Sequence, residues 1–462
     1  MYRPLLLIAL PALLGGCERL DRAAHTATGY ASHQMCSATF VSGLDSTAFY
    51  RDAVAPTGGI ISSLFSQQID REHREVTTRL AGLVESRAIY RGTEGCLVVA
   101  GALPTSPPAT VRTPGRALLP EIAGPAPVET ADPAIKAAFD AAFSETEGEP
   151  PRNTKAIVIV HNGRVIAERY APGYGVDTPV IGWSATKSVT NALLGILVRQ
   201  GKIDMQAPAP IAAWADPKDP RHAITPDNLL RMNAGLDVGQ SLTASWRDAF
   251  DPSAQMVFEE RDMAAYAASF PLAFAPGTDW NYTNGNTMQL DRIIRDKTGG
   301  NAQGVLDFAH RELFDKLGMQ HVTLEFDSTG TPLGASHMFA TPRDWAKFGL
   351  LYLNDGMAGG ERILPEGWVD YSASYTPHSG PYGYAAGFWT NRSSESSGAR
   401  YRVERGIPAD AFMARGSKGQ YVIVIPSQHL IVARFGIANN DRDDMDMVAR
   451  VVKAVISTLP RS

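Results

Sequence analysis

Residues 182–188 read Gly-Trp-Ser-Ala-Thr-Lys-Ser, between a loop rich in Gly and Pro and the apolar run Val189 to Val198. If this run is a helix, Ser184 and Lys187 lie three residues apart on its first turn and share one face. A serine is a poor nucleophile unless a base removes its proton, and a lysine serves as that base only when desolvation or nearby cations keep it uncharged. Burial at the positive N-terminus of a helix favours both conditions. The segment is a candidate nucleophile and base, although a helix-capping serine followed by a surface lysine gives the same pattern.

The composition is that of a globular protein long enough for two or three domains. The chain has 462 residues, of which 44% are hydrophobic and 20% charged, and its net charge is −5. It contains no basic cluster interleaved with aromatic residues, so nothing supports nucleic-acid binding. Neither His-Glu-x-x-His nor paired Cys-x-x-Cys occurs, and we expect no metal and no organic cofactor. Gly-x-Ser-x-Gly is also absent from the sequence, which argues against an α/β-hydrolase elbow.

The N-terminus has the pattern of an export signal. Arg3 is followed by an apolar run from Leu5 to Leu14 and then by Gly-Gly-Cys at 15–17. A run this short does not span a bilayer as a helix, but it suits a signal peptide. Residues 14–17 resemble the lipobox of bacterial lipoproteins, which would make Cys17 the acylated first residue of the mature protein. We therefore expect 1–17 to be a signal peptide with a lipobox, and a periplasmic protein anchored to the membrane by lipid on Cys17; the alternative is a plain signal peptide with an incidental cysteine.

Three cysteines are present in the chain. If Cys17 is acylated, Cys36 and Cys96 remain, and an exported compartment permits a disulfide between them. We predict that disulfide, with two buried free thiols as the alternative.

Composition divides the remaining chain into three parts. Residues 18–102 contain both remaining cysteines and suggest a small accessory domain. Residues 103–129 are rich in Pro, Thr, Ala and Gly, which is typical of a linker. Residues 130–462 form the main domain.

Within the main domain, patterns of strands and helices occur at both ends. Apolar segments at 156–160 and 164–170 flank Asn162-Gly163, a strong hairpin signal. A second apolar pair, at 421–425 and 430–435, precedes residues with helical spacing, while 185–370 is mostly helical in pattern. We predict an α+β fold, with an antiparallel sheet flanked by helices and an inserted, mostly helical subdomain.

A second candidate site is the turn-rich loop at 280–286, Trp-Asn-Tyr-Thr-Asn-Gly-Asn. A tyrosine near Lys187 could relay a proton to the leaving group, with its phenol kept partly ionised by the neighbouring ammonium. Taken alone, Tyr282 in such a loop is more often a residue that packs its ring.

The combination of these elements resembles the penicillin-recognising serine hydrolases. Ser184-x-x-Lys187 opens a helix, Tyr282-x-Asn284 follows about a hundred residues later, and a glycine-containing stretch precedes a late strand. Ser-x-x-Lys with Lys-Thr-Gly is a known signature of class A relatives. The resemblance covers roughly residues 130–460 and looks closest to the 6-aminohexanoate-dimer hydrolase and esterase branch. It implies a β-lactamase/transpeptidase-like fold, Ser184 as nucleophile, Lys187 as base assisted by Tyr282, and Asn284 orienting Lys187 or the substrate.

The third motif of the family has two candidates. A literal Lys-Thr-Gly at 297–299 follows an apolar helical stripe, so we expect it at a helix end and not on the sheet. The better match is 414–420, Ala-Arg-Gly-Ser-Lys-Gly-Gln, which leads into a strand. Matching Gly416 to the motif glycine implies an oxyanion hole made by the backbone N–H groups of Ser184 and Ser417. A shifted register would place it at Gly419 and Gln420 instead.

Ala414 departs from the family pattern, because β-lactamases and carboxypeptidases carry Lys or His at this place to hold a substrate carboxylate. Its presence counts against β-lactam hydrolysis, unless Arg415 or Lys418 substitutes. The sequence thus predicts a serine hydrolase that forms an acyl-enzyme with a small-molecule ester or amide. Alternatives are a true β-lactamase or D-alanyl-D-alanine carboxypeptidase, and a non-catalytic envelope binding protein on the same fold.

Overall fold

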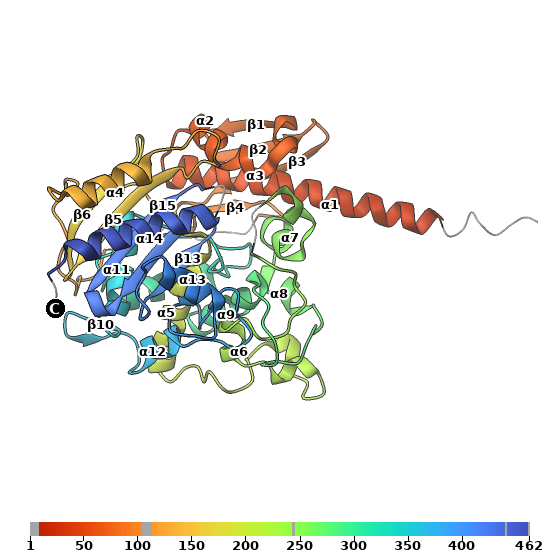
Figure 1. The fold of residues 1–462 in the computed structure, drawn as a ribbon. Coiled ribbons are helices and arrows are strands. Elements are labelled where there is room, and N and C mark those ends of the chain that lie inside the picture. Colours follow the sequence, from red (N-terminus) through yellow and green to blue (C-terminus); the bar gives the residue numbers. More distant parts are fainter. Residues whose placement is uncertain (1–8, 104–112, 243–244, 439–440, 461–462) are drawn as a thin grey trace, which may run out of the picture.

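A computed structural model describes residues 9–103, 113–242, 245–438 and 441–460 (Figure 1). Its centre is a six-stranded sheet with the order β12-β13-β14-β15-β5-β6, in which every neighbouring pair is antiparallel. The strands are β5 (Thr154–His161), β6 (Arg164–Tyr170), β12 (Trp389–Thr390), β13 (Phe412–Gly416), β14 (Gln420–Ile425) and β15 (Leu430–Gly436). Because β15 pairs with β5, the late hairpin completes the sheet that the early hairpin begins.

Both predicted hairpins are present. Asn162 and Gly163 join β5 to β6 with φ values of 50° and 76°, so both occupy the left-handed region that a tight two-residue turn requires. The second hairpin joins β14 to β15 through the short turn Pro426–Gln428.

Helices cover both faces of the sheet (Figure 1). Alternate residues point to opposite faces of a strand: Ile157 and Ile159 pack with α4 (Pro133–Phe143) and α14 (Asp441–Thr458). Val158 and Val160 belong instead to the core that holds α5 (Thr186–Arg199) and α11 (Pro342–Leu353). The result is the predicted antiparallel sheet flanked by helices.

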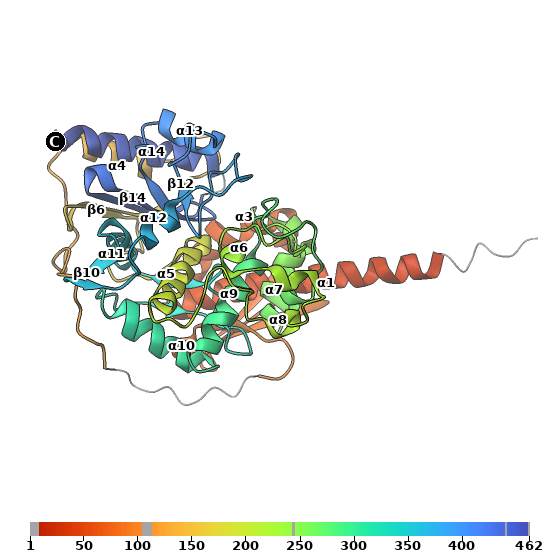
Figure 2. The same ribbon diagram turned by 90° about the horizontal axis from the view of Figure 1, so that it is seen from below.

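The predicted helical region lies beside α5, on the side away from α4 and α14 (Figure 2). Its helices are α6 (Pro226–Leu230), α7 (Pro252–Glu259), α8 (Met263–Ala268), α9 (Asn284–Lys297) and α10 (Ala302–Ala309). Further along the chain are α12 (Trp368–Ala373) and α13 (Ser397–Glu404). Short strands form two minor sheets: β7 (Val180–Ile181) with β9 (Met338–Ala340) and β8 (Thr323–Leu324), and β10 (Met357–Ala358) with β11 (Glu361–Arg362). Lys297 is the last residue of α9, so the literal Lys-Thr-Gly does lie at a helix end.

The N-terminal segment is a long helix packed on its own small sheet. Helix α1 (Ala9–Cys36) packs on a four-stranded antiparallel sheet of β1 (Phe65–Asp70), β2 (Glu75–Leu80), β3 (Val84–Tyr90) and β4 (Cys96–Val98). Short helices α2 (Ser46–Phe49) and α3 (Ala55–Gly58) lie between them in sequence. Residues 1–8 of the expected signal peptide and the side chain of Cys17 fall outside the described part of the chain. No helix within the described ranges has the length and apolar character needed to cross a membrane.

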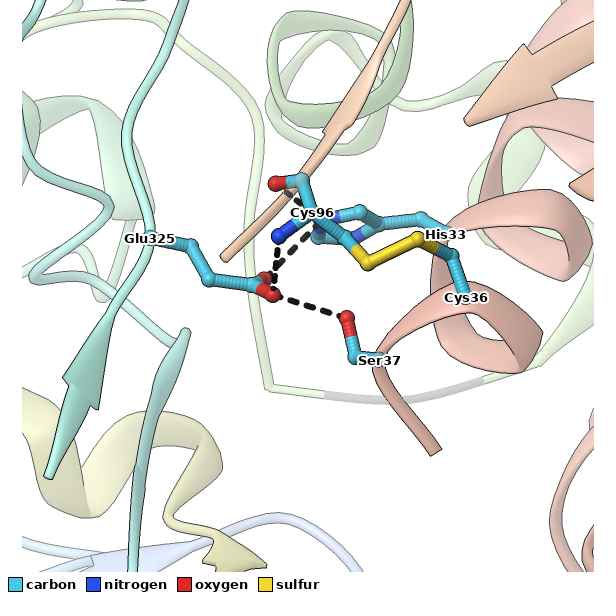
Figure 3. The surroundings of a disulfide bond; sticks show 5 residues. All are labelled: His33, Cys36, Ser37, Cys96 and Glu325. Atoms are coloured by element: carbon cyan, nitrogen blue, oxygen red, sulfur yellow. Dashed lines mark hydrogen bonds and ion pairs between the residues drawn. A yellow bond between two sulfur atoms is a disulfide. The ribbon is translucent and has the colours of Figure 1, made fainter. Parts of the chain in front are cut away.

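A disulfide between Cys36 and Cys96 joins the end of α1 to β4 (Figure 3). Beside it, Glu325 of the main domain accepts hydrogen bonds of 2.8 Å from the Cys96 N–H and from the Ser37 hydroxyl. The same carboxylate lies 2.9 Å from Nε2 of His33. The predicted cross-link therefore stands at the junction where the N-terminal segment meets the main domain.

Residues 113–129 follow the surface of the main domain in an irregular path. The Leu118 N–H donates to the Lys316 carbonyl at 2.8 Å, and Arg343 donates to the carbonyl of Ala126 at 2.8 Å. Residues 104–112 of the expected linker lie outside the described residues.

Candidate active site

Ser184 lies on a tight turn directly before α5. The 3₁₀ turn Trp183–Ala185 includes Trp183 at φ 45°, a left-handed conformation that is costly for a bulky residue and is found mostly at functional sites. Gly182 permits the turn, because a Cβ at this position would overlap the ring of Trp345. Ser184 thus lies two residues before the first residue of α5. The sequence had suggested a place on the first turn of that helix.

Lys187 is the buried partner of this serine. It lies in the first turn of α5 and is 2% exposed. Its Nζ lies 3.2 Å from Ser184 Oγ and donates to Asn284 Oδ1 and to the Ala335 carbonyl, both at 2.7 Å. Asn284 therefore orients the lysine, one of the two roles expected for it.

The environment makes Lys187 a base at neutral pH. Burial lowers the pKa of Lys187 to about 7, while the nearby Asp291 acts to raise it. Burial also raises the pKa of Asp291 well above its ordinary value, although a hydrogen bond from Thr190 opposes that rise. With a pKa of about 7, a large share of the lysine is uncharged near neutral pH.

Tyr282 is buried beside the same pair. It precedes α9, and its ring centroid lies 5.0 Å from Lys187 Nζ. Burial raises the pKa of the phenol, and the opposing effects of Ser184 and Arg415 do not offset it. The expectation of a partly ionised tyrosine is therefore wrong: at 2% exposure, desolvation of the anion outweighs its charged neighbours. Among the described residues the hydroxyl makes no hydrogen bond of good geometry, although Ser184 lies near enough to lower its pKa, so it remains able to donate to a bound molecule.

Strand β13 runs directly past the serine. A Cβ on Gly416 would come within 3.0 Å of the Ser184 nitrogen, so only glycine allows this approach. Ser417, the next residue, lines the same cleft as Ser184. The alternative register is disfavoured, because neither Gly419 nor Gln420 lines the two cavities at Ser184, and Gln420 pairs with Gly416 between β14 and β13. The geometry therefore favours Gly416 and Ser417 for the third motif.

Ala414 and the two cations that might replace the missing charge there, Arg415 and Lys418, point in different directions. Ala414 packs in the core beneath the sheet. Lys418 donates to the Thr57 hydroxyl of the N-terminal segment at 2.7 Å. Arg415 lines the cleft with Tyr282, and its guanidinium lies 5.2 Å from the ring centroid of Trp389. Of these three candidates, Arg415 is the one that presents a cation beside the serine.

A family model described as Beta-lactamase matches residues 139–454. The chain belongs to the beta-lactamase family. The 6-aminohexanoate-dimer hydrolase of Paenarthrobacter ureafaciens is 26% identical over 234 residues, which are 47% of this chain and 56% of that protein. This chain therefore spans only about half the length of that relative.

Solved structures share the fold. A Bacillus anthracis structure named for the 6-aminohexanoate-dimer hydrolases has a TM-score of 0.58 at 22% identity, covering 76% of this chain and 92% of its own. A penicillin-binding protein homologue from Caulobacter crescentus has a TM-score of 0.54 at 17% identity, covering 71% and 97%. The resemblance and the fold class expected from the motifs are thus confirmed.

Two cavities meet at Ser184 in this member of the beta-lactamase family. The smaller, of about 430 Å³, is aromatic and cationic and is lined by Tyr282, Tyr382, Trp389 and Arg415. The larger, of about 920 Å³ including its open mouth, extends toward α1 and α7. Ser184, Ser241 and Ser417 line both cavities.

Sequence reasoning missed two parts of this site. The Ala335 carbonyl that holds Lys187 has no sequence signal, because every residue carries a carbonyl. The N-terminal residues of the larger cavity are ordinary apolar and small side chains, which look the same as core residues.

A buried trio is formed by His33, Glu325 and His337, whose ligand atoms lie within 4.8 Å of one another. Within the described ranges, this is the group whose composition would suit a metal site. Protein partners already engage these atoms. The Ser336 hydroxyl lies 2.6 Å from His337 Nδ1 and the Gln34 amide 3.2 Å from Nε2, while Glu325 is bound as described above. Burial lowers the pKa of His337 well below its ordinary value. The trio is best explained as a hydrogen-bonded junction between the N-terminal segment and the main domain.

Proposed function

We propose that this protein is an esterase or amidase that forms an acyl-enzyme on Ser184. The observation that carries the proposal is Lys187 Nζ, buried 3.2 Å from the serine hydroxyl with its pKa lowered to about 7. A lysine with this pKa has the basicity that a general base needs at neutral pH. A binding module gains nothing from a desolvated lysine next to a serine, because burying that amine costs stability.

In the proposed reaction, Ser184 Oγ attacks the substrate carbonyl carbon as neutral Lys187 accepts its proton. The N–H groups of Ser184 and Ser417 bind the oxyanion. The neutral Tyr282 hydroxyl donates a proton to the leaving oxygen or nitrogen and recovers one from the Lys187 ammonium, and the carbonyl–heteroatom bond breaks. Water then attacks the ester on Ser184 as Lys187 accepts a proton from it. The bond between the acyl carbon and Oγ breaks, the Lys187 ammonium returns the proton to Oγ, and the acid is released.

The test uses p-nitrophenyl acetate and butyrate, with intact-mass analysis for the acyl adduct. We expect turnover and an adduct in the wild type, neither in Ser184→Ala, and unchanged behaviour in Ser457→Ala, a control at an exposed serine. Wild-type turnover no faster than that of Ser184→Ala would contradict the proposal.

Arg415 favours a second candidate, hydrolysis of a β-lactam or a D-alanyl peptide. These substrates carry a carboxylate, and the guanidinium beside Tyr282 could hold it in place of the missing cation at 414. Nitrocefin assayed in parallel separates this activity from ester hydrolysis.

We also propose that the protein is exported and anchored to the membrane through lipid on Cys17. Fractionation of cells that express the full chain tests this. Wild type is expected in the membrane fraction with a covalently bound fatty acid, and Cys17→Ala without either; lipid label retained by the variant would contradict it.

A further inference from the structure

The N-terminal segment forms one wall of the larger cavity at Ser184. Ala27 and Tyr30 of α1, Ile61 of the 3₁₀ turn Gly59–Leu64, and Phe65 at the start of β1 all line it. These residues lie before residue 139, where the match to the beta-lactamase family begins. The family domain alone would leave this side of the cleft open.

The opposite wall is also apolar. Ala249 lies in the 3₁₀ turn Trp246–Phe250, and Val257 and Phe258 lie on α7. Ala249 packs in one hydrophobic cluster with Ala27, and Ile61 and Phe65 pack against that cluster. The cavity is therefore a mostly apolar chamber that reaches Ser184, with Asp248, Asp251 and several hydroxyl side chains also in its lining.

Two turns that contribute residues to the chamber, Gly59–Leu64 and Trp246–Phe250, also carry large apolar side chains in contact with solvent. Ile60 is 81% exposed and Leu64 is 53% exposed, while Trp246 and Phe250 on the facing turn are 37% and 38% exposed. A Cβ on Gly59 would lie 3.2 Å from the Trp246 ring, so the two turns lie side by side. Exposed apolar side chains on two adjoining turns beside an apolar cavity are consistent with a site that takes an apolar ligand.

Several bonds hold the wall in place before any substrate binds. Besides the disulfide and the Glu325 contacts, Lys418 binds Thr57, and Arg22 of α1 pairs with Glu259 of α7 at 3.2 Å. The ring of Trp183, next to the nucleophile, stacks on Tyr30 with 6.5 Å between centroids. The chamber is preformed, so a ligand does not have to order it.

We propose that the N-terminal segment, residues 18–102, determines substrate selectivity and that the substrate is an ester or amide with an extended unbranched apolar chain. The chain lies in the chamber and brings the scissile carbonyl to Ser184. This inference rests on the proposed function. Each methylene buried in the chamber is expected to raise kcat/KM by about fourfold until the chamber is filled.

The test measures how kcat/KM depends on the length of the substrate's apolar chain, in the wild type and in variants of the chamber wall. Two series are assayed, p-nitrophenyl esters from acetate to octanoate and acetate esters of ethanol to octanol, because the chain can belong to either side of the carbonyl. We expect kcat/KM of the wild type to rise with length in one series. Ile61→Asn, with Ile61→Ala as a milder variant, should flatten that rise, so that kcat/KM falls more for the longest member of the series than for the shortest ester.

Leu83→Asn makes the same kind of change at a turn residue that is 89% exposed and lines none of the cavities described above, and it should behave as wild type. Ser184-dependent turnover that does not depend on chain length in either series overturns the selectivity proposal alone. The same holds for a length dependence that Ile61→Asn and Leu83→Asn preserve equally. Absence of Ser184-dependent turnover in both series overturns the proposed function as well.

Discussion

The family domain and the N-terminal segment contribute to the cleft in different ways. The family domain supplies three polar side chains: Ser184, which is half-buried, Lys187, which is buried and held by hydrogen bonds, and Tyr282, which is buried. The segment supplies mostly apolar side chains such as Ala27 and Ile61, together with Thr26 and Thr57. The two proposals thus locate chemistry and selectivity in separate parts of the chain, and they predict that changes to one part affect mainly the function of that part.

The largest expected effect is on kcat, from a change that removes the base and leaves the chamber wall unchanged. Lys187→Met removes the base, so we expect kcat for p-nitrophenyl acetate to fall by about a thousandfold, since general bases contribute about 10²- to 10⁴-fold. Lys202→Met, at an exposed lysine one turn beyond α5, is the control. A Lys187→Met variant that retained a tenth of the wild-type kcat would show that another group removes the serine proton.

The next effect concerns the attachment of the segment. Replacing Cys36 and Cys96 by Ser removes a cross-link across 60 residues, and losing a native disulfide costs about 2–5 kcal/mol in small domains. We expect a lower melting temperature and a weaker preference for long chains, with acetate hydrolysis retained because Lys187 and Ser184 lie on other elements. Dithiothreitol should reproduce the result in the wild type and change nothing further in the double variant. Equal loss of acetate and octanoate hydrolysis would show that the segment supports the catalytic residues themselves.

The family domain and the N-terminal segment also differ in how much of their structure could be predicted from the sequence. The Asn162-Gly163 hairpin and the Ser184–Lys187 pair were predictable, because a two-residue turn and a nucleophile beside its base each require particular residue types. The disulfide followed from the cysteine count. The ionisation of Tyr282 was predicted wrongly, because a sequence does not show that the ring is 2% exposed. The wall of the chamber could not be foreseen either, because an apolar residue in a cavity and one in a core have the same chemistry.

Within the cleft, the cationic cavity can be compared with the apolar one. Arg415→Gln should raise KM for p-nitrophenyl hemisuccinate by about tenfold and leave KM for the neutral butyrate ester unchanged, since a half-buried hydrogen-bonded charge pair contributes about 1–2 kcal/mol. Arg415→Lys keeps the charge and should recover part of the loss. Equal effects on both esters would mean that Arg415 supports Tyr282 or Trp389 and does not bind the anion.

The smallest effect concerns the pKa that makes Lys187 a base. Because the uncharged amine is the active form and its pKa is lowered to about 7, kcat/KM should rise with pH and reach half its maximum near pH 7. Asp291 acts to raise this pKa, so Asp291→Asn should move the midpoint to lower pH. The shift is expected to be small, because burial of Lys187 affects its pKa more than Asp291 does. Asp296→Asn, on the exposed side of the same helix, should leave the profile unchanged. A midpoint that moved equally in both variants would reflect overall charge, and one that stayed near pH 7 in both would mean that Asp291 adds nothing to the electrostatics of the lysine.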